Sequence, residues 1–168
     1  MDGTKQHILS LLVENHPGVL ARVAGHLSGR GFNIDSLAVG ETRDPQFSRM
    51  TIVLSGDDRV LEQCNKQLNR LVEVVKINDF SNVPDFIDRE LILVKVDTGR
   101  TGRRDIMELA EIFRARIVDT SPKSLTVELT GTPDKINAFL DLVKPFGIKE
   151  LVRTGRIAMA RGGQGFTE

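Results

Sequence analysis

The chain has 168 residues, of which 40% are hydrophobic and 27% are charged, so it is long enough for one ordinary domain or two small ones. Its 23 basic and 23 acidic residues cancel and it contains neither Trp nor Tyr, which excludes nucleic-acid binders that depend on excess positive charge and aromatic stacking. A single cysteine allows no internal disulfide, and the lack of a signal-like or membrane-length apolar run predicts a cytoplasmic protein that contacts no membrane.

In the first half of the chain, apolar periodicity predicts the order βαββαβ. Strands are expected at residues 7–13, 33–39, 48–54 and 71–77, where apolar and β-branched residues gather or alternate. A first helix is expected to have Pro17 as its first residue and to end at Gly31, which can adopt a left-handed cap conformation. A second helix is expected to begin at Asp57 and Asp58, with Cys64 on its buried face.

The second half repeats the same pattern. Residues 81–85 form a polar, proline-bearing link, which predicts a boundary between one domain at 1–80 and another at 81–168. Strands are expected at 90–96, 116–119, 125–129 and within 148–159, and helices around 106–113 and from Thr132 to Gly147. The predicted fold class is therefore α+β, with two ferredoxin-like βαββαβ units. Because each unit has only about 80 residues, mutual packing or dimerisation is expected.

The sequence offers little that could carry catalysis. Only three histidines are present, His26 is expected on a helix surface, and no His, Cys or acidic residues have the spacing of a metal site. The loop at residues 99–102 lacks the Lys-Ser/Thr of a nucleotide-binding loop, and one Arg-Gly-Gly at 161–163 is too little for RNA binding. We expect no catalytic residue, no metal and no cofactor in this chain.

The segment ENHPGVLARVAGHLSGRGFNI, residues 14–34, holds the best candidate for a binding site. The first N–H groups of a helix are unpaired and carry partial positive charge, and Gly18 would let an anion approach them closely. Asn15 and Asn33 can each donate and accept hydrogen bonds, which suits the ammonium and carboxylate of an amino acid. Plain helix capping, with His16 as the N-cap, is the alternative. The candidate effector-binding residues are Asn15, His16, Pro17, Gly18, Val19, Leu20, Asn33 and Ile34.

Three stretches of the first half, ENxPGVL from Glu14, RGFNI from Arg30 and SRMTI from Ser48, resemble the small regulatory subunit of acetolactate synthase (acetohydroxyacid synthase). The first unit resembles an ACT domain, a βαββαβ module that binds small effectors. In the second half the resemblance rests on RELxLVKV from Arg89, EIFR at 111–114 and RTG at 153–155.

The resemblance implies that the chain is not itself an enzyme. It would activate a catalytic subunit that uses thiamine diphosphate, Mg²⁺ and FAD, and would impose feedback inhibition by valine or another branched-chain amino acid. Two ACT domains would form a homodimer, with Asn15 and Gly18 of one chain facing Asn33 and Ile34 of the other. Residues up to about 80 would sense the effector, and the rest would support regulation and assembly. The alternative is an amino-acid-sensing ACT module that regulates another enzyme or a transcription factor, although no helix-turn-helix pattern or basic stripe is present.

Overall fold

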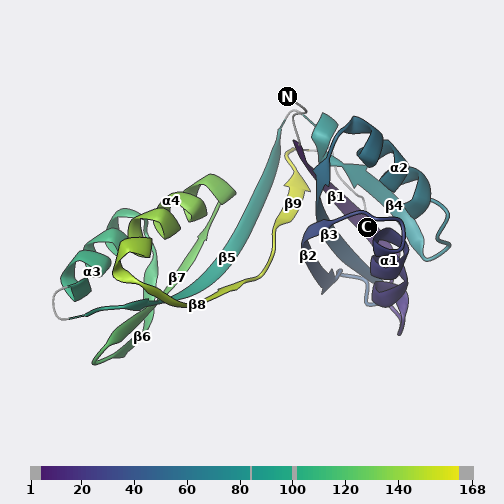
Figure 1. Cartoon of the computed structure of the whole chain (residues 1–168). Coiled ribbons are helices and arrows are strands. Elements are labelled where there is room, and N and C mark those ends of the chain that lie inside the picture. The colour runs from purple at the N-terminus through teal and green to yellow at the C-terminus, as the bar shows by residue number, and fades with distance from the viewer. Residues whose placement is uncertain (1–4, 84, 100–101, 163–168) are drawn as a thin grey trace. The chain divides into compact units, whose positions relative to one another are not determined.

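The computed structural model describes residues 5–83, 85–99 and 102–162, which form two compact units (Figure 1). The first unit holds the described residues up to Ile87 together with those from Arg156 onward, and the second is Asp88–Gly155. The sequence placed a boundary at residue 80 and assigned the whole C-terminal segment to the second domain. The contacts instead place residues 81–83, 85–87 and 156–162 with the first unit, because apolar side chains there pack on its sheet.

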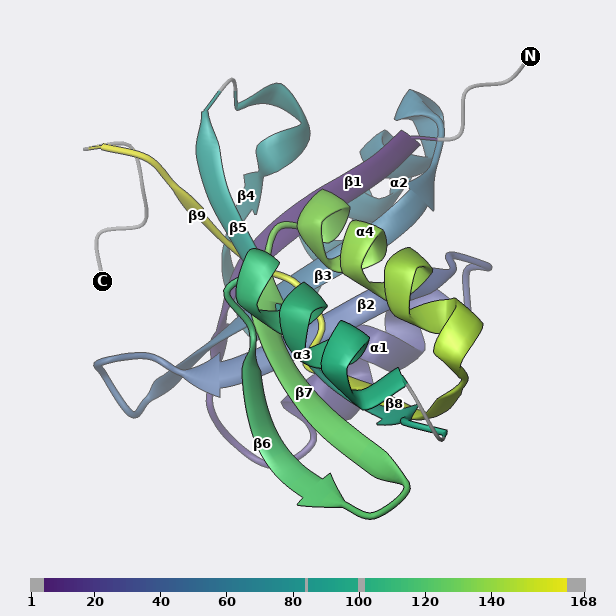
Figure 2. The same ribbon diagram turned by 90° about the vertical axis from the view of Figure 1, so that its left-hand side faces the viewer.

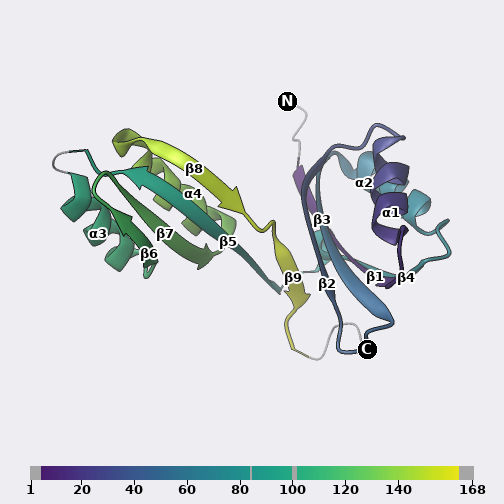
Figure 3. The same cartoon turned by 90° about the horizontal axis from the view of Figure 1, so that it is seen from below.

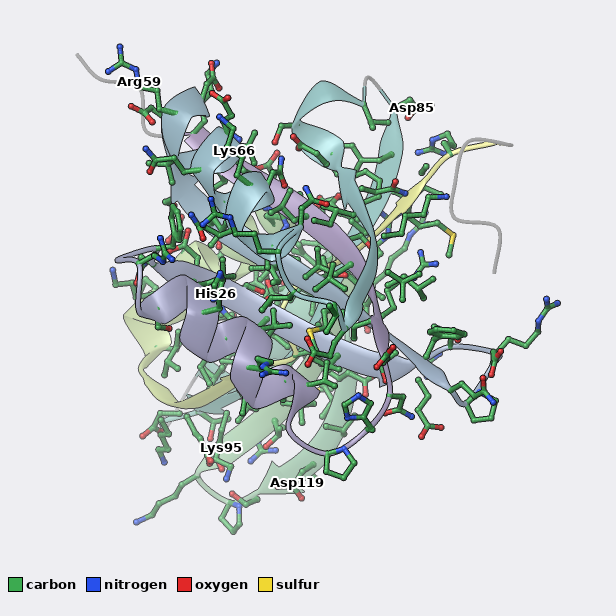
Figure 4. The ribbon with its side chains drawn as sticks, turned by 90° about the vertical axis from the view of Figure 1, so that its right-hand side faces the viewer. His26, Arg59, Lys66, Asp85, Lys95 and Asp119 are labelled. Carbon is green, nitrogen blue, oxygen red and sulfur yellow. The ribbon has the colours of Figure 1, made fainter. Side chains whose placement is uncertain are left out.

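The first unit has the predicted order βαββαβ. Its strands form an antiparallel sheet in the order β2-β3-β1-β4, so β2 and β4 are its two edges. Both helices pack on one face of this sheet, and Figure 4 views them from their exposed side, with His26 labelled on α1 and Lys66 on α2. The elements are β1 (Lys5–Glu14), α1 (Val19–Ser28), β2 (Ile34–Glu41), β3 (Phe47–Gly56), α2 (Asp58–Leu68) and β4 (Val74–Asp79).

The main core of the first unit lies between this sheet and its helices. Alternate residues of the central strand β1 point to it, and every third or fourth residue of α1 does the same, as expected for an amphipathic helix on a half-buried sheet. Cys64 is fully buried in this core, which confirms that it packs as a small apolar residue, and burial raises the pKa of its thiol to about 12. The fully buried core residues include Leu9, Leu11, Val13, Leu27, Ile52 and Leu68.

The opposite face of the same sheet carries a second, smaller core. Ile8 of β1 and Val53 of β3 pack there against Phe80, which begins the 3₁₀ turn η1 (Phe80–Asn82), and against Ala158 near the end of the chain. The predicted last strand at 148–159 is in fact two strands, β8 (Ile148–Arg153) and β9 (Ile157–Ala160). Gly155, with a φ of 84°, lies between them and ends the second unit, and β9 belongs to the first.

The second unit repeats the fold with a sheet in the order β6-β7-β5-β8. Figure 2 shows α3 and α4 side by side on one face of this sheet, over a core that includes Ile92, Ile106 and Phe139. Thr132 accepts a hydrogen bond from the Lys135 N–H and Pro133 begins α4, as predicted. The elements are β5 (Phe86–Asp97), α3 (Gly102–Ile112), β6 (Arg116–Ser121), β7 (Ser124–Gly131), α4 (Pro133–Val143), η2 (Lys144–Phe146) and β8. These observations confirm the predicted α+β fold class with two ferredoxin-like units.

Candidate functional site

The candidate site begins at a tight turn between β1 and α1. The Val19 N–H donates to the His16 carbonyl at 3.4 Å, and Gly18 has φ 91° and ψ −15°, the values of the third residue of a type II turn. Helix α1 therefore begins at Val19 with Gly18 as its N-cap. The predictions of Pro17 as the first helical residue and His16 as the N-cap are wrong, because the left-handed Gly18 delays the helix.

The start of α1 differs from the starts of the other well-defined helices in the described part of the chain. Asp57 caps α2 through the Val60 N–H at 2.9 Å, and Thr132 caps α4. At α1 the N-cap residue is glycine, no side chain makes a cap hydrogen bond, and the first turn contains no acidic residue. No side chain of the first turn therefore offsets the positive end of the helix dipole at α1. Plain capping by a side chain does not explain this segment.

Asn15 lies beside this turn, at the end of β1. Its side-chain Nδ2 donates to the Pro45 carbonyl at 2.9 Å and to Oε1 of Glu41 at 3.2 Å. Glu41 is the last residue of β2, so Asn15 marks the point where that edge strand ends.

The other polar candidate, Asn33, lies at the opposite end of the sheet. It precedes β2 and donates from Nδ2 to Oδ1 of Asp35 at 2.8 Å. In the register of the sheet, Ile34 pairs with Leu54, whereas Glu14 pairs with Phe47 at the other end of β3. One chain therefore brings the residues 15–20 together and leaves Asn33 and Ile34 apart from them.

The apolar candidates also divide. Val19 is only 3% exposed and its side chain belongs to the main core, so only its backbone can face a ligand. Leu20 is 45% exposed on the surface of α1, and Ile34 is half-buried against the core. Among the apolar candidates, Leu20 and Ile34 are thus the two whose aliphatic side chains remain at least partly exposed.

Charged residues surround the turn, and two of them, Arg22 and Glu73, were not among the candidates predicted from the sequence. Nε2 of His16 contacts Oε2 of Glu14 at 2.9 Å, and the hydrogen bond to that carboxylate raises the pKa of His16. Arg22 on the first turns of α1 makes an ion pair with Glu73, which is only 6% exposed. Hydrogen bonds from its own backbone N–H and from Arg22 lower the pKa of Glu73. Since Glu73 lies 51 residues beyond Arg22, no local sequence pattern could have indicated the pair.

The remaining predicted features contribute nothing to this site. His26 was predicted to lie on the helix surface. The structure exposes it only in part, and its Nε2 is buried without a hydrogen-bond partner among the described residues. In the part of the chain that the structure describes, no three His, Cys, Asp or Glu side chains gather as a metal site would require. Of the predicted loop at 99–102, residues 100–101 lie outside the described residues, as does the Arg-Gly-Gly motif beyond Gly162.

Comparison with known proteins gives two family matches. A model described as the AHAS small subunit-like ACT domain covers residues 9–76, and one described as the small subunit of acetolactate synthase covers residues 89–162. The chain belongs to the acetolactate synthase small-subunit family. The family predicted from the sequence motifs is thereby confirmed, together with the ACT domain in the first unit.

Individual relatives cover almost the whole chain. The probable acetolactate synthase small subunit of Archaeoglobus fulgidus is 53% identical over 157 residues, which are 94% of this chain and 98% of the relative. The acetolactate synthase small subunit of Mycolicibacterium smegmatis is 49% identical over 164 residues, with 98% and 96% covered. The crystal structure of the small subunit from Thermotoga maritima aligns with a TM-score of 0.86 at 41% identity, covering 94% of this chain and 98% of that one.

Membership of this family has two direct consequences. A small subunit of acetolactate synthase implies a catalytic large subunit as its partner, and it places the chain in branched-chain amino acid biosynthesis. The ACT domain agrees with a regulatory rather than a catalytic role. Within the described ranges, no helix is long and apolar enough to cross a membrane.

Proposed function

We propose that this chain activates the catalytic subunit of acetolactate synthase in the cytoplasm and confers feedback inhibition by a branched-chain amino acid. The observation that carries the proposal is the uncapped N-terminus of α1 behind the Pro17-Gly18 turn. A carboxylate fits there because backbone N–H groups and the helix dipole favour an anion, and Gly18 has no side chain to block it. The exposed Leu20 side chain on the same turn of the helix supplies contact for an aliphatic group.

The second polar candidate, Asn33, is not at this turn in one chain, because it precedes the far end of β2. We propose that two chains pair side by side through their β2 edges to supply it. In an antiparallel pair across a two-fold axis, the start of one β2 lies opposite the end of the other. Asn15 contacts the end of its own β2 through Glu41, so it would lie near Asn33 and Ile34 of the partner subunit.

Edge strand β2 also has the surface that such pairing requires. Val39 on this strand is 44% exposed and Leu20 on the adjoining helix is 45% exposed, although both are apolar. An edge strand with unpaired backbone groups is a natural place for a second copy to add its own strand. Dimerisation would bury both apolar side chains and complete the effector site in one step.

Under this proposal the chemistry belongs entirely to the catalytic subunit. Thiamine diphosphate, Mg²⁺ and FAD would be held there, and this chain would bind only the effector and its protein partners. Valine, leucine and isoleucine differ by a methylene or a branch, which is worth about 1–3 kcal/mol in an apolar pocket. The contacts at Leu20 and Ile34 are therefore compatible with any of the three.

The test is reconstitution with the catalytic subunit from the same organism. Acetolactate formation should rise when the full chain is added and should fall again when one of the three branched-chain amino acids is titrated in. The full chain alone should give no product from pyruvate. A reconstituted enzyme whose rate is unchanged by the chain would overturn activation, and one insensitive to all three amino acids would overturn feedback inhibition.

A further inference from the structure

The described end of the chain, residues 156–162, is here called the C-terminal strap. It follows the second unit but belongs to the first, where β9 pairs with β5 (Figure 3). Ala158 is 7% exposed and packs into the small core formed by Ile8, Val53 and Phe80, whereas the next residue, Met159, is 61% exposed. One side of the strap therefore seals the sheet face opposite the helices.

Polar contacts hold the strap at both of its ends. At its start, the Arg156 backbone N–H donates to the Ser36 hydroxyl at 2.9 Å, and the Arg156 guanidinium donates to Oε1 of Gln6 at 3.1 Å. Near its described end, Nε of Arg161 donates to Oδ1 of Asp85 at 2.9 Å. The strap is thus attached to β1, to β2 and to the segment before β5.

The contact with Ser36 falls at an irregular point of the edge strand. The register between β2 and β3 shifts between Ile34 and Ser36, as it does at a β-bulge, where the ladder of hydrogen bonds is locally interrupted. Asp35 within this bulge accepts hydrogen bonds from Asn33 and from Ser55. The bond from Arg156 therefore supports the short segment that orients Asn33 and Ile34.

We propose that the C-terminal strap positions the effector-binding end of β2, and that Ser36 and Arg156 are positioning residues for the effector. The inference rests on the proposed effector site. Its physical basis is that a bulged edge strand lacks some of the ladder bonds that would otherwise hold Asn33, so a bond from outside the sheet replaces them. Arg156 is the first residue of the strap and belongs to the same unit as Ser36.

The experiment compares single substitutions in the full chain by calorimetric titration with valine, leucine and isoleucine. Ser36→Ala removes the acceptor for Arg156 and should weaken binding about three- to tenfold, whereas Ser36→Thr keeps a hydroxyl and should bind like wild type. Ser10→Ala is the matched control: Ser10 is fully buried in the same sheet, and its hydroxyl has no hydrogen-bond partner among the described residues.

A second pair of substitutions tests the strap itself. Ala158→Glu puts a charge into the small core and should weaken effector binding, while Met159→Glu, on the exposed side, should leave it unchanged. Urea unfolding of each variant confirms that the protein titrated is folded. If wild type binds and Ser36→Ala binds equally well, or if Ser36→Thr fails to restore binding, the positioning role is overturned. If wild type binds none of the three amino acids, the effector site fails, and the strap proposal fails with it.

Discussion

At Gly18 the backbone conformation, rather than lack of space, requires glycine. Its φ is 91°, yet a Cβ built at this position would meet nothing within 4 Å. Gly18→Ala should therefore lower the free energy of unfolding by about 1–2 kcal/mol, the cost of a left-handed L-residue. Gly18→Asp should in addition abolish effector binding, because its carboxylate would occupy the helix N-terminus and repel the ligand.

The control for backbone strain at Gly18 is Gly147→Ala. Gly147 has a φ of 98°, and a Cβ there would have ordinary contact with Asp97 in the second unit. Because its ψ of 109° lies outside the left-handed helical region, urea unfolding should show a loss of stability at least as large as for Gly18→Ala, but calorimetry should show unchanged effector binding. If an enzyme reconstituted with the Gly18→Asp variant were still inhibited normally by the effector, this turn would not be part of the effector site.

Asn33 has no structural role that would make its substitution costly to folding. It is exposed, and its side chain contacts only the neighbouring Asp35 in the hydrogen bonds described above. Asn33→Ala should weaken effector binding about ten- to a hundredfold, since a polar group of the bound ligand loses its partner. Activation of the catalytic subunit should persist. Asn69→Ala, which removes an exposed asparagine that caps α2, should leave the inhibition curve unchanged.

His16 should titrate above its ordinary pKa of 6.5 because of Glu14. Because the pKa of His16 is raised in the folded state, protonated His16 stabilises the fold. This stabilisation is complete below pH 6.5 and is lost as the pH rises through the folded-state pKa. An NMR titration of the imidazole should show this shift, and Glu14→Gln should move the pKa of His16 back down. A pKa that is indifferent to Glu14→Gln would contradict the pairing.

Among the structural elements, the two edge strands of the first sheet each expose a valine. Val39 on β2 is 44% exposed at one edge, and Val75 on β4 is 53% exposed at the other. If chains pair through β2, Val39→Glu should weaken the dimer about tenfold or more, because a charge on an edge strand opposes pairing. Val75→Glu is the matched change on the other edge.

Sedimentation equilibrium measures this difference directly. Wild type and Val75→Glu should be dimers at the same concentration at which Val39→Glu dissociates. Effector binding should be lost together with the Val39→Glu dimer, since the site is completed by the partner. A stable wild-type monomer, or a dimer broken by Val75→Glu alone, would place the interface elsewhere.

At the scale of the whole molecule, the first unit depends on residues that follow the second. A chain ending at Gly155 lacks the C-terminal strap and would re-expose Ile8, Val53 and Phe80 to water. Because full burial of such a side chain is worth about 1.5–3 kcal/mol, their partial exposure should destabilise the first unit by about 2–4 kcal/mol. A chain ending at Gly162 keeps the strap and should unfold like wild type in urea. Equal stability of the two truncations would show that the strap contributes nothing to the fold.

The contacts of the strap also complicate a simpler experiment, in which effector binding is measured on a fragment that contains only the first βαββαβ unit. A fragment ending near Asn82 contains the predicted sensing elements, but it lacks Ala158 and also Val83 and Phe86, which pack against the small core. Such a fragment would test effector binding and loss of stability at once. The full chain with single substitutions separates the two effects.

The sequence by itself determined what depends on neighbouring residues. Thr132 followed by Pro133 indicates a helix start, apolar periodicity places the strands, and the motif around Asn15 and Gly18 indicates the family, because these signals act over a few residues. Even here the prediction that the first helix begins at Pro17 is wrong, since Pro-Gly before a helix is compatible with both a helix start and a type II turn.

Only the tertiary structure decided which distant residues meet. The pairing of Arg22 with Glu73, the return of Ala158 to Ile8 and the bond from Arg156 to Ser36 join positions that are separated by 51, 150 and 120 residues. The first depends on how α1 lies beside the segment before β4 and the other two on the path of the chain after Gly155, and local propensity specifies neither. Asn15 and Asn33 lie at opposite ends of one sheet for the same reason, so a site that uses both requires a second chain.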